Sequence, residues 1–231
     1  DAAGNAASQF TNTIVLDTVA PTIDTLVVST DDTVNSSDTK SAVAFSGTTT
    51  GIEDGQNIAV VIGGISTSVA VSGNTFSGTA DLSGVADNTA LAVSADVSDA
   101  AGNAASQFTN TIVLDTVAPT IDTLVVSTDD TVNSSDTKSA VAFSGTTTGI
   151  EDGQNIAVVI GGISTSVAVS GNTFSGTADL SGVADNTALA VSADVSDAAG
   201  NAASQFTNTI VLDTVAPTID SVSVADGTYK V

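Results

Sequence analysis

The chain is 231 residues long and carries 26 acidic residues against three lysines and no arginine, for a formal net charge of −23. It contains no cysteine or histidine, which excludes disulfide bonds and removes the usual ligands of zinc. Because phosphate binding requires clustered lysine or arginine, the charge also argues against nucleic acid and anionic membranes as partners.

An internal repeat organises the whole chain. The stretch DAAGNAASQFTNTIVLDTVAPTID begins at Asp1, Asp99 and Asp197, and residues 1–122 are identical to residues 99–220. A repeat of this length can fold by itself, whereas solenoid repeats of about 20–45 residues must stack to bury a core. We therefore expect two identical domains, 18–115 and 116–213. Residues 1–17 would be the last strand of a preceding repeat and 214–231 the first strand of a following one, either frayed or borrowing a sheet edge.

Within residues 18–115, short β-branched runs of period two alternate with Gly, Asn, Asp and Ser clusters. In the run 90–97, for example, Leu91, Val93, Ala95 and Val97 alternate with alanine, serine and aspartate at 92, 94 and 96, as in a strand with one buried face. This pattern predicts an all-β fold of tandem immunoglobulin-like β-sandwiches with about seven strands each. In chain order the predicted strands are 23–29, 42–47, 57–62, 66–71, 75–80, 90–97 and 107–114.

Three features of the repeat have a local explanation. Phe45, Phe76 and Phe108 are its only aromatic residues, and we expect them in the core. Residues 72–74 (Ser-Gly-Asn) predict a tight hairpin between the fourth and fifth strands, and Gly102 provides positive φ in the 99–103 turn. The segment 19–21 (Val-Ala-Pro) predicts a short, stiff connector.

Acidic and amide side chains gather in loops that the predicted topology brings to the pole where the chain enters each domain. Calcium takes six to eight oxygen ligands, so this pole predicts a Ca²⁺ site at each joint. The alternative is that these residues only form turns and solubilise the chain. Acids at the opposite pole (Asp31, Asp32, Asp38, Asp81 and Asp87) are weaker candidates. The predicted ligands are Asp17, Asp24, Glu53, Asp54, Asp99 and Asn103, and for the next joint Asp115, Asp122, Glu151, Asp152, Asp197 and Asn201.

The DAAGN turn, the strand ending in TIVLDT and the VAPTID connector resemble the bacterial immunoglobulin-like repeats of giant RTX-type surface and biofilm adhesins, in their extender region. The resemblance implies a protein exported by type I secretion to the surface of a Gram-negative bacterium. It implies repeats rigidified by interdomain calcium that project a distal adhesive domain. The motif positions matched are Asp99, Asn103, Asp115, Asp197 and Asn201.

Identical copies favour a structural spacer, whose partners are the neighbouring repeats of the same chain. We expect a monomer that neither binds nucleic acid nor inserts into a membrane. The alternative is a module that binds a glycan or a host protein, although Tyr229 is the only tyrosine and tryptophan is absent. Ice binding is less favoured, since this period does not suit a flat threonine array. An enzyme is least favoured, because Glu53 and Asp54 are adjacent and lack a second group across a cleft.

Overall fold

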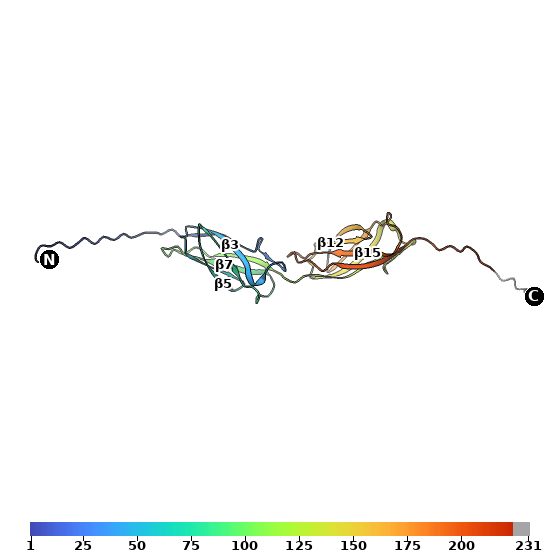
Figure 1. The fold of residues 1–231 in the computed structure, drawn as a ribbon, viewed down its shortest axis with the longest axis horizontal. Helices are drawn as coiled ribbons and strands as arrows, with labels where there is room; N and C mark the ends of the chain where they lie inside the picture. The colour runs from blue at the N-terminus through green and yellow to red at the C-terminus, as the bar shows by residue number, and fades with distance from the viewer. Residues whose placement is uncertain (224–231) are drawn as a thin grey trace, which may run out of the picture. The chain divides into compact units, whose positions relative to one another are not determined.

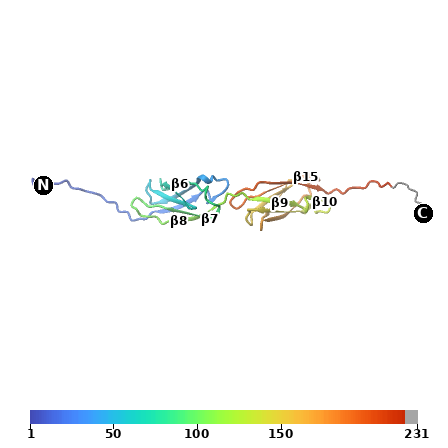
Figure 2. The same cartoon turned by 90° about the horizontal axis from the view of Figure 1, so that it is seen from below.

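A computed structural model describes residues 1–223 of the chain. It divides into two compact units, of which the first comprises Asp1–Thr116 and the second begins at Val117. Both are built from strands that run along the length of the unit (Figures 1 and 2). The predicted all-β sandwich class is therefore confirmed.

Eight strands and one short 3₁₀ turn form each unit. The first unit contains β1 (Thr22–Val28), β2 (Thr33–Val34), η1 (Lys40–Ala42), β3 (Val43–Thr50), β4 (Asn57–Ile62), β5 (Ile65–Ala70), β6 (Thr75–Ala80), β7 (Asn88–Asp96) and β8 (Phe108–Leu114). The second contains β9 (Thr120–Val126), β10 (Thr131–Asn133), η2 (Lys138–Ala140), β11 (Val141–Thr148), β12 (Asn155–Ile160), β13 (Ile163–Ala168), β14 (Thr173–Ala178), β15 (Asn186–Asp194) and β16 (Phe206–Asp213).

Two sheets pack face to face in each unit. In the first unit their strand orders are β1-β3-β6 and β2-β8-β7-β4-β5. The second unit repeats this with β9-β11-β14 and β10-β16-β15-β12-β13. Neighbouring strands are antiparallel except for β2 with β8 and β10 with β16, which are parallel.

The short strand β2 was not among the seven predicted strands, which correspond to β1 and β3 to β8. Two residues are too few to show a period, and the strand depends on a contact distant in sequence. Asp32, at φ +61°, accepts a hydrogen bond from the Val28 N–H (2.9 Å) and another from the Asn110 amide (3.1 Å). This carboxylate therefore guides the chain from the first sheet to the edge of the second.

The core lies between the two sheets and is aliphatic apart from the phenylalanines. Phe45 and Phe76 are 2% and 3% exposed, which confirms their predicted core position, whereas Phe108 is half-buried and packs against the core. Gly47 leaves room for the Phe76 ring. A Cβ there would lie 2.1 Å from the Thr25 carbonyl oxygen and 2.3 Å from the ring.

The predicted turns have the expected backbone geometry, but one of them joins different partners. Gly73 and Asn74 have φ of +56° and +61°, and Gly102 has φ of +93°, as predicted. The turn at 72–74, however, connects β5 to β6, which belong to different sheets. The tight turn is therefore confirmed, since Ser72 and Thr75 exchange backbone hydrogen bonds across it, but its two strands do not pair in one sheet. A tight turn fixes chain reversal without fixing the sheet that the next strand joins.

Segments outside the sheets carry exposed apolar side chains. Residues 1–21 and 214–223 contain no strand, and Phe10, Ile14 and Leu16 are at least 85% exposed. The assignment of 1–17 and 214–231 to neighbouring repeats stays a prediction, and residues 224–231 lie outside the described part. Among residues 1–223, no helix has the length and apolar character needed to cross a lipid bilayer.

Candidate functional site

The incoming pole of the first unit is the end that receives residues 17–21, and three loops meet there. Glu53 links the β3–β4 loop to the β7–β8 loop, since its Oε2 accepts the Ala100 N–H at 2.8 Å. Asp54 links the β3–β4 loop to the β5–β6 turn, since its Oδ1 accepts the Gly73 N–H at 2.7 Å. The structure thus brings together the loops that carry Glu53, Asp54, Asp99 and Asn103.

Asp99 closes the turn 99–103 with its side chain. Its Oδ1 accepts the Asn103 N–H (2.7 Å) and its Oδ2 accepts the Asn103 side-chain amide (2.8 Å). The Asn103 side-chain hydrogen bond is the main reason that the pKa of Asp99 lies below its usual value. Asp99 is only 4% exposed, so the pole contains a carboxylate that folding holds ionised beneath its surface.

The incoming chain is attached to this same turn. The Asn103 amide donates to the Asp17 carbonyl oxygen at 3.2 Å, and the Asp17 side chain accepts the Val19 N–H at 3.0 Å. Pro21 is buried, and a Cβ on Gly51 would lie 3.5 Å from its Cα. The connector is therefore tied to its domain by one hydrogen bond and one packed proline.

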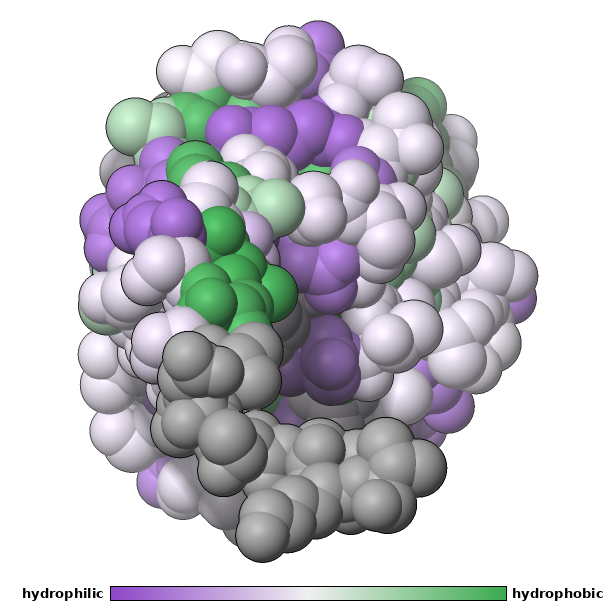
Figure 3. Space-filling view, turned by 90° about the vertical axis from the view of Figure 1, so that its right-hand side faces the viewer, coloured by the Kyte–Doolittle hydropathy of each residue, from purple (hydrophilic) through white to green (hydrophobic). Residues whose placement is uncertain are grey.

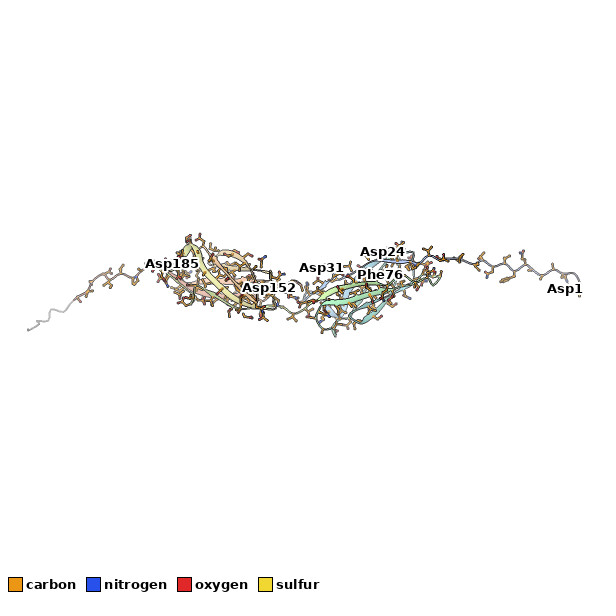
Figure 4. The ribbon with its side chains drawn as sticks, turned by 180° about the vertical axis from the view of Figure 1, so that it is seen from behind. Asp1, Asp24, Asp31, Phe76, Asp152 and Asp185 are labelled. Carbon is orange, nitrogen blue, oxygen red and sulfur yellow. The ribbon has the colours of Figure 1, made fainter. Side chains whose placement is uncertain are left out.

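Asp24 is held differently from the other predicted ligands. It lies where β1 and β3 lose register, and it accepts the Thr22 hydroxyl (2.6 Å) and the Thr50 hydroxyl (2.8 Å). The bond from Thr22, followed by that from Thr50, holds the pKa of Asp24 below its usual value. Figure 4 places Asp24 toward the incoming end of the unit and Asp31 toward the other end.

The second unit repeats these contacts. Glu151 accepts the Ala198 N–H (2.8 Å), Asp152 accepts the Gly171 N–H (2.7 Å), and Asp197 accepts both Asn201 donors. Asp122 accepts the Thr120 and Thr148 hydroxyls, which lower its pKa, Thr120 more strongly. Asp115 belongs to the first unit, where its N–H donates to the Val34 carbonyl at 2.9 Å.

The donor set at the incoming pole suits a hard cation only in part. Glu53, Asp99, the Asp17 carbonyl and the Asn103 amide are all oxygen-bearing groups, which calcium prefers. Within residues 1–223, no three acidic side chains are placed together as a metal-holding group. The fit therefore depends on amide, carbonyl and hydroxyl oxygens as well as carboxylates.

A threonine that the sequence analysis missed lies beside this pole. Thr49 is 2% exposed, its N–H donates to the Asn74 carbonyl (2.9 Å), and its Oγ1 has no hydrogen-bond partner. Thr147 repeats this feature in the second unit. A buried hydroxyl without a partner is costly, so Thr49 lowers the stability of the unit as it stands. Its inward position in the alternation of β3 was the signal that could have identified it.

The outgoing pole holds the departing chain with a charge cluster. The Asp87 carboxylate accepts the Thr116 N–H at 2.8 Å and pairs with Lys40 at 3.1 Å. Partial burial raises the pKa of Asp87, but the hydrogen bonds from Thr116 and Lys40 outweigh it and hold the pKa below its usual value. Asp185 holds Thr214 in the same way at the end of the second unit opposite Asp152 (Figure 4).

The remaining acids of the outgoing pole serve their own loops. Asp81 accepts Ser83, Asp38 accepts Ser29 and the Asn35 N–H, and Asp31 accepts the Thr33 N–H. These carboxylates therefore serve mainly to shape turns. Figure 3 shows the side of the structure that lies at the right of Figure 1, where hydrophilic residues form separate patches among residues of intermediate hydropathy.

Comparison with known proteins places the repeats among adhesins. No protein-family model and no curated protein matches the chain. Among solved structures, a Ca²⁺-stabilized adhesin of an Antarctic bacterium is 32% identical (TM-score 0.46), with 87% of this chain and 51% of that chain covered. A tetra-tandem repeat from the extending region of a large adhesion protein is 27% identical (TM-score 0.37), with 82% and 48% covered. The chain thus spans about half the length of these two.

A single-domain structure is matched over nearly its whole length. The bacterial immunoglobulin-like domain of the M. primoryensis ice-binding adhesin is 30% identical, with 42% of this chain and 99% of that chain covered (TM-score 0.32). The sequence of one whole domain is therefore matched from end to end.

Proposed function

Because this chain belongs to the bacterial immunoglobulin-like domains of adhesins, we propose that it is a stretch of an extender region, which holds a distal adhesive part away from the cell. The observation that carries this proposal is that each unit closes its own core while both segments leaving it are tied down. Asn103 binds the incoming Asp17 carbonyl, and Asp87 binds the outgoing Thr116 N–H. Nothing distinguishes the copies chemically, so what they contribute together is length.

The proposal implies a short connector between neighbouring repeats. Thr116 is bound within the first unit, and Pro119 is buried in the second. Only Val117 and Ala118 lie between these two anchors. Two residues permit much less bending than a flexible linker of the usual length.

We further propose that calcium binds at the incoming pole and restrains the connector there. Glu53, Asp99 and Asn103, with the Asp17 carbonyl, would supply the first ligands. The adhesin of the Antarctic bacterium is described as Ca²⁺-stabilized, which supports the proposal. A bound calcium ion supplies positive charge at a pole where carboxylates otherwise repel each other. The other ligands named from the sequence (Asp24, Asp54, Asp115, Asp122, Glu151, Asp152, Asp197 and Asn201) remain part of this proposal.

The proposed location is the outside of a Gram-negative bacterium, reached by type I secretion. Extracellular modules bind calcium with dissociation constants of about 0.1–1 mM, so such sites fill outside the cell and stay empty in the cytosol. Export would then stiffen the chain without any further signal.

The experiment that tests the proposal is small-angle X-ray scattering on this chain, with calcium titrated against a chelator and magnesium as the control. We expect the maximum dimension to rise and the distance distribution to narrow at millimolar calcium but not at millimolar magnesium. Unchanged scattering, with both units folded throughout, would contradict the calcium proposal. A compact, folded-back shape under all conditions would contradict the extender proposal itself.

A further inference from the structure

Two of the four sheet edges in the first unit carry a feature that discourages pairing with another chain, because the edge strand β1 has a register shift between Ile23 and Thr25 and the edge strand β2 is only two residues long. The other two edge strands, β5 and β6, belong to different sheets and lie beside each other, where the Thr67 hydroxyl reaches the Thr79 carbonyl (3.5 Å). The edge strand β5 pairs with β4 over six residues without a shift. It contains no charge and no proline, the residues that commonly prevent an edge strand from pairing with another chain.

The hydrogen-bonding phase of β5 identifies its unused groups. The loop Gly63–Gly64, with φ of +56° and +84°, joins Ile62 to Ile65 as a directly hydrogen-bonded pair. Hydrogen bonds to β4 then fall on every second residue of β5. The next residue of this series is Val71, and its N–H donates to the Gln56 carbonyl, as the alternation requires. The backbone N–H and C=O groups of the remaining residues point away from β4. Those residues are Ser66, Ser68 and Ala70, all of which are exposed.

The order of residues in β5 is symmetric about Thr67. When two copies are laid antiparallel about this residue, Ser66 lies opposite Ser68 and Ile65 opposite Val69, while Thr67 faces its own copy. The outward-pointing groups of Ser66 and Ser68 then form the hydrogen-bonded pairs. Matched hydroxyl and apolar neighbours across a strand pair are favourable, and no charges meet. A second copy of this chain is therefore the best-fitting occupant of the edge.

Charge selects the antiparallel arrangement. Asp54 lies at the Ala70 end of β5, where it binds the Gly73 N–H. Antiparallel pairing puts the two Asp54 side chains at opposite ends of the paired strands, separated by about 20 Å or more for six residues. This distance exceeds the Debye length of about 8 Å at physiological salt, whereas parallel pairing would bring the two carboxylates side by side.

We propose that β5, and β13 in the second unit, form a homophilic docking edge at which two copies of this chain pair antiparallel about Thr67 and Thr165. Because strands run along the length of each unit, paired chains run in opposite directions, as adhesins from two facing cells would. One such pair is weak, but repetition along an array raises the total affinity by about 10²–10⁴-fold. This role goes beyond that of an extender and requires no calcium.

The first test uses the absence of cysteine from the native chain. Thr67→Cys places two thiols opposite each other in a pair that is not hydrogen-bonded, with Cα atoms about 4.5 Å apart, which a disulfide can bridge. We expect covalent dimers on mild oxidation at high protein concentration, several-fold more than from the matched control Ser46→Cys, which is exposed on β3. Equal yields from the two variants would overturn the proposed register.

The second test measures clustering of beads coated with the chain. Glutamate at Ser66, Ser68, Ser164 and Ser166 should abolish the clustering seen with the native chain, and so should lysine at the same four positions. Mixing beads of the two variants should restore it, because opposite charges then face each other. The matched control carries glutamate at exposed positions of the other sheet, Ser46, Ser77, Ser144 and Ser175, and should cluster like the native chain.

Each contrary result counts against the proposal. Native beads that do not cluster, or a control variant that loses clustering equally, would overturn it. Mixed beads that fail to cluster would exclude direct pairing of the two edges. If lysine beads bind native beads as well as they bind glutamate beads, the attraction is general rather than specific. Far-ultraviolet circular dichroism would verify that all variants remain folded.

Discussion

Asp87 holds the backbone N–H of Thr116 at 2.8 Å, and so ties the end of one domain to its own body through a side chain 29 positions earlier. Replacing Asp87 by Ala removes this acceptor and leaves Lys40 without its carboxylate. We expect faster amide hydrogen exchange at Thr116, by about tenfold, with little change in the strands of the core. The control is Asp81→Ala, whose carboxylate serves Ser83 within the same pole. Unchanged exchange at Thr116 would show that the clamp does not restrain the connector.

Gly47 cannot accept a side chain. Because a Cβ would meet a backbone oxygen at 2.1 Å and the buried Phe76 ring at 2.3 Å, Gly47→Ala should destabilise the first unit by about 2–4 kcal/mol. Gly84→Ala is the matched control, since a Cβ at Gly84 meets nothing within 4 Å. Urea denaturation measures the change in the free energy of unfolding for both variants. Similar midpoints for the two variants would mean that the sheet adjusts at little cost.

The unpaired Thr49 hydroxyl should cost stability in the absence of calcium. Thr49→Val keeps the shape and removes the oxygen, and we expect it to stabilise the calcium-free unit by about 1 kcal/mol. Its neighbour Thr48 is the control, because its hydroxyl contacts that of Thr25 at 2.8 Å and Thr48→Val should bring no gain. Thermal denaturation in chelator tests this. A loss of stability in Thr49→Val would reveal a partner for the hydroxyl, such as a bound water molecule.

The proposed calcium site predicts a specific loss in Glu53→Gln. The amide can still accept the Ala100 N–H, so the loop keeps its shape while the ligand loses its charge. At ten times the dissociation constant, calcium should stabilise the native unit by about 1.4 kcal/mol, and most of this gain should vanish in the variant. Asp96→Asn, at a carboxylate held by Gln107, is the control. Equal stabilisation of both variants by calcium would remove Glu53 from the ligand set.

Lowered carboxyl pKa values predict acid sensitivity. Hydrogen bonds hold the pKa of Asp24, Asp81 and Asp99 below the unfolded value of 3.8, so the folded state binds protons more weakly than the unfolded state. The stability they contribute is complete well above pH 3.8 and declines as the pH falls through 3.8 toward the lower folded values. Thermal denaturation between pH 7 and pH 3 in high salt, which screens charge repulsion, should show this decline. A flat profile would contradict it.

Period-two alternation was enough to predict the strands with long ladders, because inward positions such as Val93 and Ala95 are set by the core that they fill. It could not predict β2, whose two residues depend on Asp32 reaching Asn110 across 78 positions. Nor could it assign β5 and β6 to different sheets, because the turn between them is compatible with either arrangement. Contacts between distant residues, rather than local preference, decide such cases.

The candidate site was predictable at the level of loops but not of individual roles. Alternating strands place the loops of Glu53 and Asp99 at one pole, and the structure joins them through the Ala100 N–H. Both carboxylate oxygens of Asp99 accept hydrogen bonds from Asn103. This arrangement depends on the backbone path of the turn, which the sequence does not specify. Thr49 was not singled out from the sequence, because threonine is common in strands and only the structure shows that its hydroxyl has no hydrogen-bond partner.

The parallel pairing of β2 with β8 determines how each domain would respond to mechanical load. The Val113 N–H donates to the backbone carbonyl of Asp32, and the Asp115 N–H donates to that of Val34. A strand near the start of the domain sequence is therefore hydrogen-bonded alongside the strand that ends it. When the ends are pulled apart, these bonds are loaded together in shear rather than unzipped one after another. If the chain serves as an extender, as we propose, this parallel pairing near the two ends of each domain is expected to resist the tension that such a role imposes.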